Sequence, residues 1–327
     1  MKESSKQNDT EQTIIGVDVS SKKLDLHNND SGSHSIIANE VKEINAWIKQ
    51  LKSKHAALLV VMEATGGYEN LLVQALHDNE VDCAVANPLQ IRNFARGCGL
   101  LEKNDRIDAK IIARFGEVVQ PPTKGKLSPD ELKLRALVHR RNQILSQVSA
   151  EKNRLNQTAD TETKDMVMQA IAFYQSQIKE VDCRIGKTID QCEILQAKAE
   201  ILNSCPGVGK ATIGTLLSEL PELGTLNRGQ VAKLVGVAPI ARDSGKKSGY
   251  RSTFAGRSTV RKVLYMAALV ATRYNRPMHV FYQRMLAKGK PKKLALVAVM
   301  RKLLITLNTM LKTKQMWRET NLAIDKN

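Results

Sequence analysis

Two apolar segments that end in carboxylates constrain the fold of this chain most strongly. TIIGVDVS and AALLVVMEA have the pattern of short buried strands, and they place Asp18 and Glu63 near strand ends. Two further short strands are expected directly after the first segment. Helical spacing then alternates with strand patterns, with helices expected over residues 43–53, 70–80 and 105–117. Three hairpin-like strands followed by alternating helix and strand predict an α/β domain with a mixed sheet.

A third segment, KNDRIDAK, adds two more acids, which lie three residues apart and so share one helix face. Carboxylates on strand ends and on one helix can converge at the edge of a sheet. Oxygen ligands suit Mg²⁺, and phosphoryl transfer often uses two such ions. We therefore predict a site for two Mg²⁺ ions, with Mn²⁺ able to substitute, whose ligands are Asp18, Glu63, Asp105 and Asp108. Each acid alone could instead be a solvated strand end or a helix cap, and three neighbouring acids are interpreted as surface residues: Asp25, Glu69 and Glu102.

Positive charge is concentrated in the C-terminal part of the chain. The formal net charge is +17, and the stretch from Ala241 to Arg318 holds 19 Lys and Arg but a single acid, Asp243. Such an excess favours a polyanionic partner. Several of these charges flank Gly-rich loops, which favours nucleic acid over an anionic membrane. The alternative is an ordinary basic surface.

The remaining composition predicts a cytoplasmic protein with no membrane span. Residues 1–12 are polar and are expected to form a disordered tail rather than a signal peptide. Apolar runs such as LALVAVM are far shorter than the ~20 residues that span a bilayer. The five cysteines form neither a CxxC pair nor a zinc spacing, so they are interpreted as reduced thiols.

The segment PPTKGKLSPDE ends the alternating pattern and predicts a domain boundary near residue 127. A charged helix follows, and then apolar residues recur in steps of four and three from Val167 to Leu195. That spacing predicts one uninterrupted heptad seam. With DTETKD as the turn, the two helices are expected to form a coiled-coil arm over residues 128–198; a helix packed in a core is the alternative. A mainly helical domain is expected over residues 199–327.

The segment CPGVGKATIGTLL has the pattern of a helix-hairpin-helix turn. Gly207 and Gly209 would let backbone N–H groups approach a phosphate, and Lys210 adds positive charge. An ordinary Gly-rich turn is the alternative. The GVGK stretch lacks the GxxxxGK[ST] spacing of a P-loop, which excludes ATP binding there.

Ser244 lies in the basic segment ARDSGKKSGYR, beside glycines that permit a tight loop with open backbone donors. An isolated serine is a weak nucleophile and needs a base or a metal to take its proton. By composition alone, a serine that only donates a hydrogen bond to phosphate is the better interpretation. Positive charge that could stabilise a phosphorane comes from Lys246, Lys247, Arg251, Arg257 and Arg261.

In combination, these motifs resemble those of the insertion-sequence family 110 transposases, which include the Piv-type invertases. The matching stretches are GVDVS, EATGGY, KNDRIDA, PGVG and DSG, and together they span nearly the whole chain. Asn104 stands where Thr is commoner in the family, but it neighbours the acids and is not one of them.

The resemblance implies a RuvC/RNase H-like α/β domain over residues 13–127, a coiled-coil connection and a mainly α-helical C-terminal transposase domain. It also implies that Asp18, Glu63, Asp105 and Asp108 bind the metal, and that Ser244 is a nucleophile forming a phosphoserine link at a 5′ end. The expected protein is a DNA recombinase that mobilises its own insertion sequence under the guidance of a bridge RNA. Because the acids and the serine lie in different domains, subunits could share sites, which predicts a dimer and a tetramer in the synaptic complex.

Three other functions are weighed against this one. A metal-dependent RuvC-like nuclease of the Holliday-junction type would use Ser244 only to bind phosphate, and it would leave no covalent protein–DNA adduct. A non-catalytic nucleic-acid scaffold would show no metal-dependent cleavage. An actin-like kinase shares the GVDVS strand, but it needs a second phosphate loop and an adenosine site, and the sequence shows neither.

Overall fold

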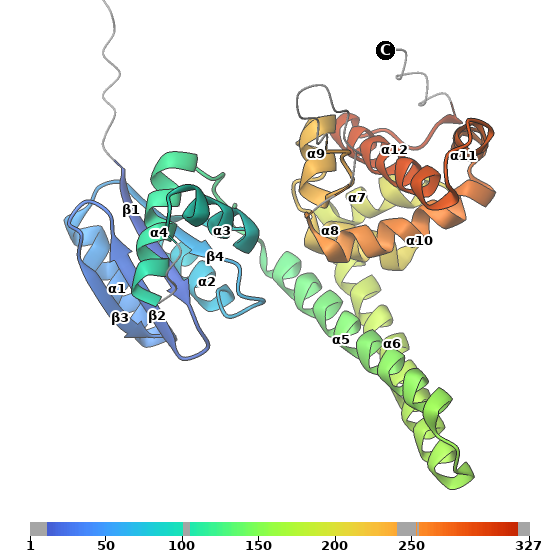
Figure 1. The fold of residues 1–327 in the computed structure, drawn as a ribbon, viewed down its shortest axis with the longest axis horizontal. Coiled ribbons are helices and arrows are strands. Elements are labelled where there is room, and N and C mark those ends of the chain that lie inside the picture. Colours follow the sequence, from blue (N-terminus) through green and yellow to red (C-terminus); the bar gives the residue numbers. More distant parts are fainter. Residues whose placement is uncertain (1–11, 101–104, 241–252, 254, 320–327) are drawn as a thin grey trace, which may run out of the picture. The chain divides into compact units, whose positions relative to one another are not determined.

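The computed structural model describes residues 12–100, 105–240, 253 and 255–319, with only the backbone for residues 105–107 (Figure 1). The chain divides into two compact units, Met1–Lys126 and Leu127–Asn327.

The first unit is built on a five-stranded mixed sheet with the order β3-β2-β1-β4-β5. The first three strands form an antiparallel meander, whereas β4 is parallel to β1 and β5 is parallel to β4. This arrangement is that of the RNase H-like fold, and it confirms the predicted fold class. The strands are β1 (Thr13–Val19), β2 (Lys23–Asn28), β3 (His34–Ala38), β4 (Leu58–Glu63) and β5 (Asp82–Ala86).

Helices cover both faces of this sheet. On one face, α1 (Val41–Lys54) and α2 (Asn70–Asp78) bury alternate residues of the strands, including Val17, Val60 and Met62. On the other face, α3 (Pro88–Gly97) and α4 (Asp105–Val119) bury the intervening residues, including Leu59 and Val61. Successive side chains of a strand point to opposite faces of the sheet. The residue that follows each of these buried side chains on its strand therefore lies on the other face.

Helix α3 has no counterpart among the helices expected from the sequence. Its segment, PLQIRNFARG, is short, and its apolar face consists of the buried Ile91 with the half-buried Phe94 and Ala95. The local signal is at its start, where Asn87 accepts a hydrogen bond from the Leu89 backbone N–H and Pro88 occupies the first turn.

The second unit begins with a helical hairpin of α5 (Pro129–Gln157) and α6 (Thr161–Asp190), which Figure 1 shows extending away from the rest of that unit. Ser128 forms a capping box at the start of α5, and Asp160 caps α6. The cap at Asp160 makes the connecting turn shorter than the expected DTETKD. The predicted pair of long helices is therefore observed, with a tighter turn.

The expectation of one uninterrupted seam to Leu195 is wrong. Helix α6 ends at Asp190, and Cys192 adopts an extended conformation before α7 (Glu193–Asn203) begins. Leu195 has the expected spacing but lies on α7, where it is 1% exposed and belongs to the core of the unit. Within α6, Val181 and Ile185 are buried near that core, whereas Ile171 and Ile178 are half-buried.

The rest of this unit is a helical body around a large apolar core. Its last helix, α12, is long and apolar enough to cross a membrane by length and composition, with a mean hydropathy of 1.7 in its most apolar window. That window is 56% buried within the described part of the chain, as in a core helix. The other helices of the body are α8 (Lys210–Glu219), α9 (Arg228–Val235), α10 (Ser258–Tyr274) and α11 (Arg276–Ala287), and α12 spans Lys292–Thr313.

Candidate active site and nucleic-acid contacts

Asp18 and Glu63 lie at neighbouring positions on one edge of the sheet. Strands β1 and β4 are parallel and pair Val17 with Met62, and the two acids are the next residue on each strand. Val17 and Met62 are buried against α1 and α2, so the acids follow them on the opposite face, the one covered by α3 and α4.

Glycine contacts bring α4 directly onto this face. A Cβ at Gly16 would lie 2.2 Å from the Ala109 carbonyl oxygen and 2.3 Å from the Ala113 nitrogen, so only glycine permits the approach. Farther along α4, a Cβ at Gly116 would lie 3.0 Å from a methyl carbon of Ile14, which precedes Gly16 on β1. Helix α4 therefore runs antiparallel to β1, and its N-terminal end reaches the end of the strand that carries Asp18.

This packing places Asp108, directly before Ala109, at the same edge as Asp18 and Glu63, while Asp105 begins the helix. The backbone thus gathers the three acidic segments that the sequence singled out. Among the described side chains, no group of three or more His, Cys, Asp or Glu is close enough to hold a metal ion, and the Asp105 side chain is not among them. Carboxylates are the donors that a hard cation prefers, and the ligand set stays a prediction.

Glu69 is a buried residue, not the surface acid expected from the sequence. It is 5% exposed and accepts hydrogen bonds from the Gly67 N–H (2.8 Å), the Thr65 hydroxyl (2.9 Å) and the Thr65 N–H (3.2 Å). Burial by itself would raise the pKa of Glu69, but hydrogen bonds from the backbone and from Thr65 outweigh it, and the pKa is lowered. The ionised carboxylate therefore holds the loop that follows Glu63. Gly66 and Gly67, shortly before Glu69, were the sequence signal for a tight loop around this acid.

Asp25 is also buried, at 3% exposed, where the sequence predicted a surface residue. It lies opposite Asp18 in the β1–β2 pairing, it forms an ion pair with Lys23 (3.1 Å), and the His34 Nε2 lies 3.5 Å from its carboxylate. Opposed residues of an antiparallel pair share a face, so Asp25 stands beside the acidic edge with its charge already compensated. Glu102, the third of these acids, lies outside the described residues.

In the second unit, the two glycines of the PGVG turn have different roles. Gly207 has φ +100°, and a Cβ there would lie 2.8 Å from Ala271 Cα, so this glycine is required for packing against α10. Gly209 precedes α8, and a Cβ there would meet open space. No described side chain caps α8, and Lys210 is exposed. Of the two glycines, Gly209 is the one placed where a phosphate could approach.

The described residues on either side of the Ser244 segment contact each other. A Cβ at Gly256 would lie 2.3 Å from the Gly236 nitrogen, and both glycines have a positive φ, +79° for Gly256 and +76° for Gly236. The Arg257 N–H donates to the Leu234 carbonyl (3.1 Å), which joins the same two stretches. Four predicted site residues of this segment lie outside the described residues: Ser244, Lys246, Lys247 and Arg251.

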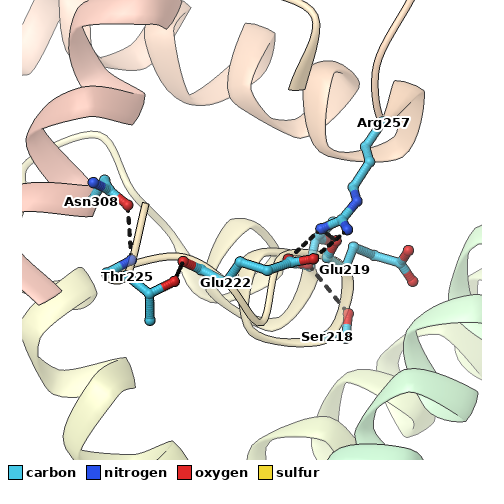
Figure 2. Close-up of polar contacts among 8 residues, drawn as sticks. Ser218, Glu219, Glu222, Thr225, Arg257 and Asn308 are labelled. Carbon is cyan, nitrogen blue, oxygen red and sulfur yellow. Dashed lines mark hydrogen bonds and ion pairs between the residues drawn. The ribbon is translucent and has the colours of Figure 1, made fainter. Parts of the chain in front are cut away.

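Arg257 and Arg261, both predicted to bind nucleic acid, make contacts inside the unit. Figure 2 shows the Arg257 guanidinium against the Glu222 carboxylate, with two hydrogen bonds of 2.6 Å and a third to the Glu219 carbonyl at 2.9 Å. The Arg261 guanidinium donates to the Val235 carbonyl (3.1 Å) and to the Ala255 carbonyl. These contacts hold the residues that follow the Ser244 segment in place. Binding of phosphate by the two arginines stays a prediction.

The Glu219 carboxylate is part of the same polar group. Burial would raise the pKa of Glu219, but the hydrogen bond and charge of His139, with the charges of Arg135 and Arg257, outweigh it and lower the pKa. The His139 Nε2 lies 2.8 Å from Glu219 Oε1, so the hairpin helix α5 is tied to the end of α8. The sequence offered no local signal for this network, because its members are far apart in the chain.

Two family models match this chain, one described as "Transposase", of the DEDD type of IS110, over residues 15–162 and one described as "Transposase IS116/IS110/IS902 family" over residues 199–283. The pilin gene-inverting proteins of Moraxella lacunata and Moraxella bovis are each 29% identical over 303 residues, covering 89% of this chain and 93% of the relative. An uncharacterized 44.8 kDa protein of insertion element IS116 from Streptomyces clavuligerus is 28% identical over 155 residues, which is 47% of this chain and 38% of that protein.

Among solved structures, T. thermophilus RuvC in complex with a Holliday junction substrate matches with 14% identity, covering 35% of this chain and 99% of that one. Its TM-score of 0.27 is too low to add to the fold assignment, which stands on the sheet topology. The two family models lie in the same order as the two units and together cover most of the chain. The chain therefore belongs to the IS116/IS110/IS902 family of transposases, enzymes that recombine DNA.

Proposed function

We propose that this transposase cuts and rejoins the DNA of an insertion sequence with two groups of residues, the acidic edge of the first unit and Ser244 of the second. The observation that carries the proposal is the convergence of β1, β4 and the start of α4, which brings together the segments of Asp18, Glu63 and Asp108. The matching family model is named for the letters DEDD, the order in which these acids and Asp105 occur in the chain.

The four carboxylates would hold two Mg²⁺ ions, and Mn²⁺ would be able to substitute for them. When bound, the metal would supply positive charge at the scissile phosphate and favour loss of the serine proton. The residues of the chain position this chemistry: the sheet register sets Asp18 beside Glu63, and the Gly16 contact sets α4 against them. Glu69 holds the loop after Glu63 in one conformation.

Ser244 would act as the nucleophile. Its oxygen bonds to phosphorus, the bond from phosphorus to the 3′ oxygen breaks, and the serine proton ends on that oxygen. The products are a free 3′ hydroxyl and a 5′ phosphoserine. Rejoining reverses these steps with a new 3′ hydroxyl, so the number of phosphate ester bonds is conserved and ATP is not needed. Lys246, Lys247 and Arg251 would stabilise charge on the phosphate oxygens.

A bridge RNA and a multimeric assembly complete the proposal. The resemblance of the motifs supports the RNA, and the net +18 of the stretch 241–318 supports strong binding of a polyanion. Because the acids and the serine belong to separate units, one subunit's acids could act with its partner's serine, in a dimer or a tetramer. Mixing Ser244→Ala and Asp18→Asn chains should then restore partial activity. No rescue despite demonstrated co-assembly would mean that each chain builds its own site.

The acidic edge is tested by neutral substitutions of equal size. Asp18→Asn, Glu63→Gln, Asp105→Asn and Asp108→Asn should each reduce recombination by about a thousandfold or more, as should excess chelator, because the ligand charge is lost. The matched controls Glu43→Gln and Asp82→Asn change exposed acids of the same unit and should keep activity. Recombination is measured on a labelled plasmid together with nucleic-acid affinity. Full activity in both Asp18→Asn and Asp105→Asn would contradict the assignment.

A further inference from the structure

Helices α11 and α12 border a hollow of about 330 Å³ on the surface of the second unit. Four of its residues recur on one face of α11, at positions 277, 280, 281 and 284. Its apolar lining is Pro277, Val280 and Phe281, and its cations are Arg276, Arg284 and Lys302. Glu319 is the single acid that lines it.

The hollow combines an aromatic ring with several cationic side chains. The Lys302 ammonium lies 4.8 Å from the centre of the Phe281 ring, and the Arg284 guanidinium carbon lies 5.3 Å from it. Within the described part of the chain, Arg276 and Arg284 form no ion pair. Val280 is 59% exposed although it is apolar. The surface therefore offers an apolar floor and a cationic rim at one place.

We propose that this hollow binds one unpaired nucleotide of a single-stranded nucleic acid. The base would lie against Val280 and would replace a cation over the Phe281 ring, because every base has an apolar face that stacks on aromatic side chains. The phosphate would be bound by the arginines, whose planar donors match its oxygens. A volume of about 330 Å³ lies at the low end for small-ligand sites and suits one nucleotide, whose base can stack on a side chain only when it is unpaired.

Asn275 connects this hollow to the PGVG turn. Its side-chain oxygen accepts from the Met278 N–H (3.3 Å) at the start of α11, and its amide donates to the Pro206 carbonyl (3.2 Å) in the turn. Asn275 is almost fully buried, so the two features are held together. A strand whose phosphate approaches Gly209 could thus continue toward α11. The inference rests on the proposed function in one respect, that the protein binds nucleic-acid strands while they are unpaired. It does not depend on Ser244.

The test measures binding of three labelled probes by fluorescence anisotropy with the full chain: a 12-nucleotide RNA, a DNA strand of the same sequence, and the corresponding DNA duplex. Val280→Glu places a carboxylate in the hollow and should weaken binding of single strands by about tenfold or more. Phe281→Ala should weaken it by about 5–150-fold, the range for loss of one stacked base. Duplex binding should stay within about twofold.

Gln283→Glu is the matched control, since it adds the same charge on an exposed position of α11 outside the hollow. Phe281 also packs against the core, so Val280→Glu, on an exposed residue, keeps the test valid if Phe281→Ala unfolds. A loss restricted to RNA assigns the hollow to a guide strand, and a loss restricted to DNA assigns it to a substrate strand. Unchanged single-strand affinity in Val280→Glu, or an equal loss for the duplex or in Gln283→Glu, would overturn the proposal.

Discussion

The acidic edge and the base of the Ser244 segment are built in different ways. At the acidic edge, the positions of the proposed ligands follow from a parallel strand register and from close contact of α4 with Gly16. At the base of the Ser244 segment, the chain is closed by contact between Gly236 and Gly256 and by the arginine contacts of Figure 2. Both regions use close backbone contacts at glycine, and the second adds polar side chains that the first site does not need for its packing.

This difference predicts how each region responds to mutation. Changes in the backbone contacts of the first unit should destabilise the sheet and its site together. Changes in the polar contacts of the second unit should cost less stability, because these groups are partly exposed, with side-chain exposures of 33% for Arg257 and 37% for Glu222. The predictions below test this contrast, starting with the largest expected effect on stability.

Gly16→Ala should lower the free energy of unfolding of the first unit by about 3 kcal/mol, because the added Cβ overlaps the backbone of α4. The measurement is urea unfolding followed by Trp47 fluorescence in a Trp317→Phe background, so that only the first unit reports. Gly125→Ala, where a Cβ would meet open space, is the control and should be close to neutral. A neutral Gly16→Ala would contradict the close packing of α4 on β1.

Glu69→Gln should cost about 2 kcal/mol at neutral pH, because an ionised acceptor of several buried hydrogen bonds is replaced. The folded-state pKa of Glu69 lies below the ordinary value of 4.5. Its stabilisation is therefore complete above pH 4.5 and is lost as the pH falls through the folded-state pKa. The same unfolding assay should show the difference between wild type and variant shrinking in acid. A difference independent of pH would mean that the charge of Glu69 is not what holds the loop.

Arg257→Ala should lower the stability of the second unit by only about 1 kcal/mol, but it should reduce recombination by a larger factor, since the pair secures the return of the Ser244 segment. Trp317 fluorescence in a Trp47→Phe background measures the stability. Arg257→Lys should not restore activity, because an ammonium cannot form both bonds. Arg184→Ala, which breaks an exposed pair with Glu180 on α6, is the control for loss of a surface ion pair. If recombination falls only as far as the loss of stability explains, Arg257 has no role in positioning the Ser244 segment.

Much of the first unit follows from local patterns in the sequence. Alternation and apolar runs mark the five strands, and the acids at strand ends follow from the same pattern. Burial of Asp25 and Glu69 could not be predicted, because it depends on partners that the sheet and a glycine turn bring to them. Helix α3 was missed although a cap and a proline mark its start and Ile91, Phe94 and Ala95 form a short apolar face.

The second unit was less predictable for a related reason. The periodicity that marks α6 continues past Asp190 into α7, so spacing alone cannot show where one helix ends. Gly207 has the sequence context of a phosphate-binding glycine, yet its contact with Ala271 on α10 is a packing requirement. Arg257 meets Glu222 across a long stretch of chain, and no local spacing indicates such a pair.

The central claim is that Ser244 becomes covalently linked to DNA. Labelled DNA is incubated with the protein, Mg²⁺ and any required guide RNA, and is then separated by denaturing electrophoresis with and without protease. Wild type and the control Ser248→Ala should give a protease-sensitive labelled species, whereas Ser244→Ala should give neither cleavage nor that species, and Ser244→Cys should retain a trace. Cleavage by Ser244→Ala at near wild-type rate, with no label retained on wild type, would contradict the account and identify a nuclease that uses water.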